Sequence, residues 1–126
     1  MTNEKQNAII EATHLGVQHT DHGILSFSIV LAFEGAGQSY GQYVLDAYDK
    51  NLDSRVPTPL AASLLLAIDK VFSVDWEDLR GISCRVFGSR TKIHGIGHFL
   101  KDKWLWLDIE KMQFVVTPFY DIVVPD

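Results

Sequence analysis

The feature that most constrains the fold is the alternation of side chains in residues 24–33, "ILSFSIVLAF". Leu25, Phe27, Ile29 and Leu31 fall on one face, while the opposite face mixes apolar residues with serines. A period of two is typical of a β-strand that buries one side. Strand-compatible segments also precede and follow it, at 8–17 and 39–48. The first 48 or so residues therefore predict an antiparallel β-meander.

One strongly helical segment follows a polar loop at residues 49–59. Thr58 and Pro59 suit the N-cap and the first helical position. The apolar residues after them recur at helical spacing, at Leu60, Leu64, Ile68, Val71 and Phe72. Leu65 and Leu66 widen this stripe. We expect a helix over about 59–73 that packs against a sheet or, over its broad apolar face, against a partner subunit.

The remaining segments complete an α+β pattern. A short helical turn is expected at 76–80, and strands are expected at 82–88 and 92–100. The aromatic tail after residue 100 suggests a short helix followed by an extended C-terminal arm. Because strands, helix and strands follow one another within 126 residues, we predict a single α+β domain spanning 1–126.

Composition excludes several classes of protein. Apolar runs are short, as in "LLLAI" at 64–68, and fall far below the ~18 residues of a membrane span. The net charge of −5 argues against non-specific binding to DNA or RNA. A single cysteine, Cys84, excludes an intramolecular disulfide framework and suits a reducing compartment. No secretory signal is visible, so we expect a cytoplasmic protein without membrane contact.

The glycine-rich stretch "EGAGQSYGQYVLD" (34–46) resembles a phosphate-binding loop at first sight. Its spacing is G-x-G-x-x-x-G, and the residues that follow favour a strand, so it does not fit a dinucleotide-binding fingerprint. A bend between two strands explains the glycines through their positive φ angles. Gln38, Tyr40 and Gln42 remain candidates to contact a ligand, although hydrogen bonding to neighbouring strands is the favoured explanation of these side chains.

Catalytic and metal-binding patterns do not emerge. His94 and His98 are four residues apart, which on a strand separates them by about 13 Å. Cys84 lies inside a predicted strand, where a buried packing thiol is expected. No G-x-S-x-G motif is present. We therefore expect no metal, no cofactor and no enzymatic activity.

Residues 85–104 combine the chemistry of a nucleotide site. Arginine and lysine can bind phosphate oxygens, aromatic rings can stack on a base, and Gly95 and Gly97 leave room for a ligand or another backbone. The candidates for ligand contact in this segment are Arg85, Phe87, Arg90, His98, Lys101 and Trp104. The alternative is that Phe87 and Trp104 belong to the core and the cations to a solvated surface.

Four stretches resemble a family of small phage proteins. They are "THLGVQ…DHGILSFSIVL" (13–31), "GAGQSYGQYVLD" (35–46), "VFSVDWEDLRGISCRV" (71–86) and "IHGIGHFLKDKWL" (93–105). Together they cover about half of the chain, in order. Some members of this group resemble the first-described type of Thoeris anti-defence protein. That resemblance implies a homo-oligomer that binds and sequesters cyclic ADP-ribose-type signals, with pockets at subunit contacts and no catalysis. A phage-encoded protein of this kind would act in the cytoplasm of the bacterial host.

Two other functions stay open. The segment "FVVTPFYDIVVP" (114–125) is more apolar than a surface tail requires, so an aromatic C-terminal arm could make this chain a phage accessory module that binds a protein partner. A cyclic-nucleotide hydrolase is the third alternative.

Overall fold

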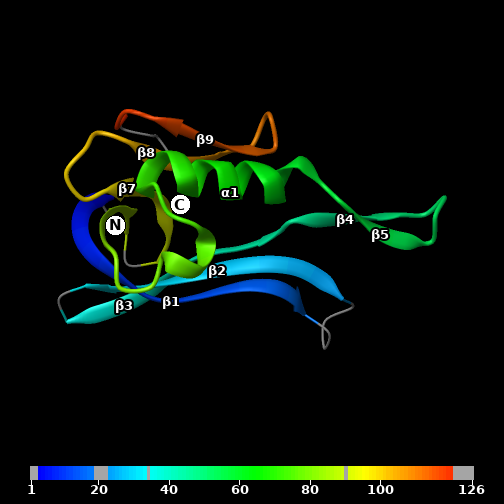
Figure 1. Ribbon diagram of the computed structural model, residues 1–126, viewed down its shortest axis with the longest axis horizontal. Helices are drawn as coiled ribbons and strands as arrows, with labels where there is room; N and C mark the ends of the chain where they lie inside the picture. Colours follow the sequence, from blue (N-terminus) through cyan, green and yellow to red (C-terminus); the bar gives the residue numbers. More distant parts are fainter. Residues whose placement is uncertain (1–2, 19–22, 34, 90, 121–126) are drawn as a thin grey trace.

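The computed structural model describes residues 3–18, 23–33, 35–89 and 91–120. It is an α+β fold, as predicted, and its antiparallel sheet curls around one helix (Figure 1). The seven strands of the main sheet run in the order β3-β2-β1-β6-β7-β8-β9. Their bounds are β1 Glu4–Gln18, β2 Ile24–Phe33, β3 Ala36–Val44, β6 Ser83–Gly88, β7 Ile93–His98, β8 Trp104–Asp108 and β9 Gln113–Thr117.

The predicted helix is α1 (Pro59–Phe72), which packs on β7, β8 and β9. Pro59 stands in the first turn, and Ser73 ends the helix in the left-handed conformation. The Thr58 hydroxyl does not cap the helix; it donates to the carbonyl of Leu45 instead (2.6 Å). The short turn is a 3-10 helix, η1 (Trp76–Asp78). No helix in the described part of the chain is long and apolar enough to cross a membrane.

Two expected details differ in the structure. The loop predicted at 49–59 contains β5 (Ser54–Pro57), which pairs with β4 (Asp46–Asp49) in a separate two-stranded arm. This arm projects beyond the end of α1 (Figure 1). The segment after residue 100 was expected to form a short helix and an extended arm. Up to residue 117 it instead contains β8 and β9, which pair as a hairpin within the sheet. Trp104, Trp106 and Val115 favour strand because these side chains can pack on a pleated face.

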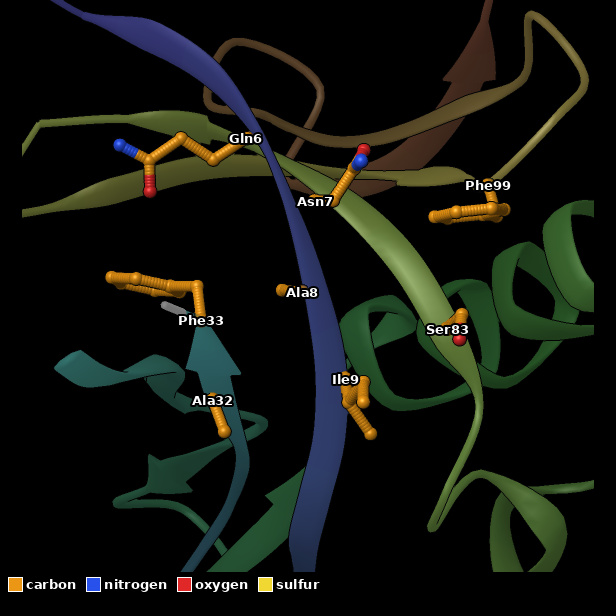
Figure 2. Close-up of a pocket in the computed structure, with 8 residues that line it drawn as sticks. All are labelled: Gln6, Asn7, Ala8, Ile9, Ala32, Phe33, Ser83 and Phe99. Atoms are coloured by element: carbon orange, nitrogen blue, oxygen red, sulfur yellow. The ribbon is translucent and has the colours of Figure 1, made fainter. Parts of the chain in front are cut away.

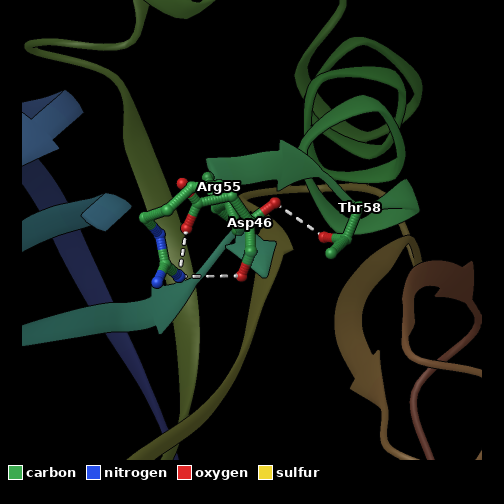
Figure 3. A network of polar contacts seen from close by, with 4 residues as sticks. Asp46, Arg55 and Thr58 are labelled. Carbon is green, nitrogen blue, oxygen red and sulfur yellow. Dashed lines mark hydrogen bonds and ion pairs between the residues drawn. The ribbon is translucent and has the colours of Figure 1, made fainter. Parts of the chain in front are cut away.

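An ion pair closes the base of the β4–β5 arm. The Arg55 guanidinium donates to the Asp46 carboxylate at 2.8 Å, next to the Thr58 hydrogen bond (Figure 3). The hydrogen bond from Arg55 lowers the pKa of Asp46, partly offset by desolvation. Farther along the arm, Tyr48 and Leu52 are largely exposed.

The sheet carries apolar residues on both faces. Val86, Ile96 and Leu105 stand opposite one another in the register and join the main core with α1. Phe87 and Trp106, one position along from these residues, point to the other face because side chains alternate along a strand. They form a second cluster there with Trp104, Val115 and Phe119.

Candidate functional site

A hollow opens where β2 ends beside β1. β1 pairs with β6 from Glu4 to Ile9 and with β2 from Ile9 onward. Among the described residues, the side of β1 at Gln6 and Asn7 therefore has no neighbouring strand beyond the end of β2. The hollow at this part of β1 has a volume of about 870 Å³. It extends to both sides of the strand, with Ala32 and Phe33 on one side and Ser83 and Phe99 on the other (Figure 2). Its lining residues are Gln6, Asn7, Ala8, Ile9, Ala32, Phe33, Ser83 and Phe99.

The lining combines aromatic rings with neutral polar groups. Phe33 lies on one side of the β1 ribbon and Phe99 on the other (Figure 2). Gln6 and Asn7 contribute side-chain amides, and Ser83 contributes a hydroxyl. None of the eight lining residues is charged. Such a lining can stack on a planar ring and exchange hydrogen bonds with its edge or with sugar hydroxyls.

A loop between β7 and β8 carries Phe99 to this hollow. The loop closes through a hydrogen bond from the His98 N–H to the Lys103 carbonyl (2.9 Å). Arg85 on β6 donates from Nε to the His98 carbonyl and from Nη2 to the Lys101 carbonyl, both at 2.9 Å. Nδ1 of His98 accepts the N–H groups of Leu100 and Lys101, both at 3.0 Å. Side chains from two strands thus hold the backbone on both sides of Phe99.

The surroundings of the His98 ring disfavour its charged form. Desolvation lowers its pKa from the ordinary value of 6.5, and the positive charges of Lys101, Lys103 and Arg85 lower it further. A neutral imidazole with its proton on Nε2 has a lone pair on Nδ1, which is what the two backbone N–H groups require. The charge state and the hydrogen bonds of His98 therefore favour the same form.

Three of the predicted site residues meet at this loop: Arg85, His98 and Lys101. Their observed polar contacts are to the loop's own backbone. Arg85 also lies over the Trp104 ring, 5.1 Å from the ring centroid. In the β1–β6 register Arg85 stands opposite Asn7, which lines the hollow. The cationic group is therefore close to the hollow, although it is not among the residues that line it.

Phe87 and Trp104, predicted to stack on a base, are buried in the second cluster, at 3% and 0% exposure. Phe119 covers them, with its ring centroid 5.2 Å from each of their rings. The Lys5 ammonium lies over the Phe119 ring, 4.3 Å from its centroid. Neither Phe87 nor Trp104 offers a free ring face for stacking on a base. This agrees with the alternative that both residues belong to the core.

The space above Gly95 and Gly97 is also filled. The Trp106 ring lies over Gly95 and the Trp104 ring lies over Gly97, so closely that a Cβ at either glycine would clash. The two glycines make room for the protein's own indoles. The sequence pattern predicted room for a ligand or another backbone at these positions, whereas the groups that lie there are the side-chain rings of Trp106 and Trp104.

The remaining predicted site residues lie on or near other strands. Gln38 on β3 bridges to the 89–92 turn, where its amide nitrogen donates to the Ser89 carbonyl (3.2 Å) and its oxygen accepts from the Lys92 N–H (2.9 Å). Tyr40 is buried, and its hydroxyl has no hydrogen-bond partner among the residues that the structure describes. Gln42 lies in β3, but its side chain, like residue Arg90, lies outside the described residues. Gln38 and Tyr40 are not among the residues that line the hollow beside β1.

Other expectations concern cysteine, metal and turn chemistry. Cys84 is a buried free thiol whose pKa burial raises to about 12, as expected of a packing residue. Within the described ranges no cluster of three or more His, Cys, Asp or Glu side chains is suited to a metal ion. Gly35 has a φ of 73° between β2 and β3, which agrees with the predicted bend.

None of the eight residues that line the hollow was among the predicted site residues, including Gln6, Asn7, Phe33, Ser83 and Phe99, which contribute its amides, rings and hydroxyl. Phe33 and Phe99 were assigned to predicted strands without a functional role. Their one visible signal is position, since each stands at or just past the end of a strand, where side chains border loops. Gln6 and Asn7 carry no pattern that separates them from ordinary polar residues.

Comparison of the chain with protein-family models, curated proteins and solved structures found no match. The resemblance to Thoeris anti-defence proteins therefore stays a prediction.

Proposed function

We propose that this protein is a non-catalytic binding protein that captures a cyclic ADP-ribose-type or related cyclic nucleotide signal in the hollow beside β1. The observation that carries this proposal is the lining itself: two phenylalanine rings, two amides and a hydroxyl around a volume of about 870 Å³. Small-molecule sites have roughly this size, about 300–1,000 Å³, and this mixture of apolar walls and few polar groups.

The chemistry of each group suggests how such a ligand binds. A base stacks on Phe99 or Phe33, and the amides of Gln6 and Asn7 bond to base edges or ribose hydroxyls. Diphosphate oxygens need cations, and the exposed Lys101 on the Phe99 loop is a candidate. This assignment replaces Phe87 and Trp104, which are buried, as stacking partners.

Sequestration without reaction has a direct test. Purified protein is loaded with a cyclic ADP-ribose isomer, separated from free ligand, and denatured by heat; the released small molecule is then identified by mass spectrometry. We expect the intact ligand after both short and long incubation. Linear ADP-ribose that accumulates with time would indicate a hydrolase instead, and the absence of any retained ligand would refute binding.

Assembly of two or more copies is part of this proposal. The buried apolar face of α1 packs on the sheet of the same chain, but the side chains of Leu65 and Leu66 remain 43% and 62% exposed. These two side chains support the predicted role of α1 as a dimer surface. Light scattering should show an oligomer for the unmodified chain and a smaller species for Leu66→Glu. The same substitution at exposed Val17, on β1, serves as the control and should leave the mass unchanged.

A second candidate function is a protein-interaction module. Exposed Tyr48 and Leu52 on the projecting β4–β5 arm favour it. The alternative based on the C-terminal arm concerns residues 114–125, of which 114–117 belong to β9. Phe119 and Tyr120 pack against Trp104 and Trp106, and 121–126 lie outside the described residues. Capture of a specific host protein that Leu52→Asp abolishes, with ligand binding intact, would support this function.

A further inference from the structure

His98 is the first residue of the loop 98–103, and its side chain also accepts hydrogen bonds from backbone N–H groups inside the same loop. The His98 N–H bonds to the Lys103 carbonyl, and its ring Nδ1 bonds to the N–H groups of Leu100 and Lys101. Asp or Asn usually performs this role, because a short side chain with an oxygen acceptor readily reaches backbone N–H groups two and three residues on. Unlike an Asn amide, an imidazole can lose this acceptor by protonation.

Arg85 holds the same loop from the neighbouring strand. Its Nε and Nη2 donate to the carbonyls of His98 and Lys101, which flank the segment that carries Phe99. The guanidinium is itself supported by the Trp104 ring beneath it. A planar fork with two fixed donors suits this role in a way that the single ammonium of lysine does not.

The charged groups around the His98 ring are mostly positive. They are the guanidinium of Arg85 on β6 and the ammoniums of Lys101 and Lys103 on the loop. Lys103 also reaches the Lys70 carbonyl on α1 at 3.4 Å. Among the carboxylates nearby, Asp102 accepts the Phe119 N–H, and Asp69 lies on α1 beside Lys70 and Lys103. On β6, the Cys84 thiol stands opposite His98 in the register.

We infer that His98 and Arg85 are positioning residues that keep Phe99 at the wall of the hollow, and that protonation of His98 releases this loop. A proton on Nδ1 removes the acceptor of both N–H groups and turns a donor toward them. It also adds a positive charge among three cations. The consequence for a ligand in the hollow rests on the proposed function, whereas the behaviour of the loop does not.

The direction of the pH effect follows from the lowered pKa of His98. Because the native loop disfavours the imidazolium, the open or unfolded loop takes up the proton first as pH falls below 6.5. The stabilisation by His98 is therefore complete above 6.5 and is lost as pH falls through the pKa of the native state.

Amide hydrogen exchange of Leu100 and Lys101 in the ligand-free protein tests the loop. After correction for the intrinsic pH dependence of exchange, protection should fall by roughly tenfold or more between about pH 7.5 and about pH 5. His98→Asn keeps an acceptor that does not titrate, so its protection should stay high and independent of pH. His98→Leu should show low protection at both pH values. Arg85→Lys should lower protection at both values and retain the dependence on pH.

Two results would overturn the inference. One is a His98→Asn variant with the same pH dependence as the unmodified chain, and the other is a His98→Leu variant with unchanged protection. Global stability measured on the same samples separates loss of the loop from loss of the fold. Titration with cyclic ADP-ribose at both pH values then tests the link to binding. If no variant binds at any pH, the proposed function fails while the exchange results still decide the role of His98.

Discussion

The indole ring of Trp104 lies directly over Gly97, where the glycine's missing side chain leaves room for it. A Cβ built on Gly97 would approach the ring atoms to 2.5 Å, and the ring is fully buried. The Trp106 ring lies over Gly95 in the same way, two residues farther along β8 and β7. The second apolar cluster of this protein therefore depends on two glycines in β7.

Gly97→Ala should destabilise the protein by about 1–3 kcal/mol, because the added methyl must displace a large ring packed on all sides. Urea unfolding followed by circular dichroism measures this change. Gly37→Ala on β3 is a matched control: its φ is not positive and its nearest contact would be 3.5 Å. It should change stability by less than about 0.5 kcal/mol, and equal effects of the two substitutions would contradict this account of β7.

Phe119→Ala should uncover the second cluster. The Phe119 ring covers Phe87 and Trp104 and contacts the Lys5 ammonium. Since the ring is only partly buried, we expect a loss of about 1–3 kcal/mol, below that of a core phenylalanine. Acrylamide quenching of tryptophan fluorescence should increase. Tyr48→Ala on the β4–β5 arm should leave quenching unchanged, and an unchanged signal for Phe119→Ala would show that another group covers the indoles.

Cys84 should be chemically inert in the folded protein. Burial raises the pKa of its thiol to about 12, so the reactive thiolate is scarce near neutral pH. Alkylation by iodoacetamide should occur only through unfolding and should accelerate with added urea. Because the unfolded thiol ionises from its ordinary pKa of 9, the contribution of Cys84 to stability declines as pH rises from 9 toward 12. Rapid alkylation without denaturant would contradict this burial.

Much of the fold could be predicted because strong periodicity decides it. The alternation at 24–33 and the helical spacing from Leu60 to Phe72 specify which face is buried, and both elements occur within a residue of the expected bounds. The β8–β9 hairpin was missed although Trp104, Trp106 and Val115 favour a strand. β5 was missed for a physical reason. A short polar strand such as 54–57 has no alternating apolar face, and its pairing with β4 is a non-local property that composition does not reveal.

The candidate site was predictable only in part. Arg85, His98 and Lys101 were recognised as a cationic and aromatic mixture, and they do meet in space. Their contacts to backbone carbonyls and N–H groups could not be foreseen, because these depend on the course of the loop. Phe87 and Trp104 illustrate the opposite problem: an aromatic residue suited to stacking on a base is equally suited to a core, and burial alone distinguishes the two.

Isothermal titration calorimetry with cyclic ADP-ribose isomers tests the central claim most directly. We expect saturable binding by the unmodified chain and a loss of about tenfold or more in affinity for Phe99→Ala, since stacking of a base on an aromatic ring contributes about 1–3 kcal/mol. Leu100→Ala removes the neighbouring, 82% exposed side chain of the same loop and should bind as the unmodified chain does. The absence of heat with every isomer, or equal losses for Phe99→Ala and Leu100→Ala, would contradict a nucleotide site in the hollow beside β1.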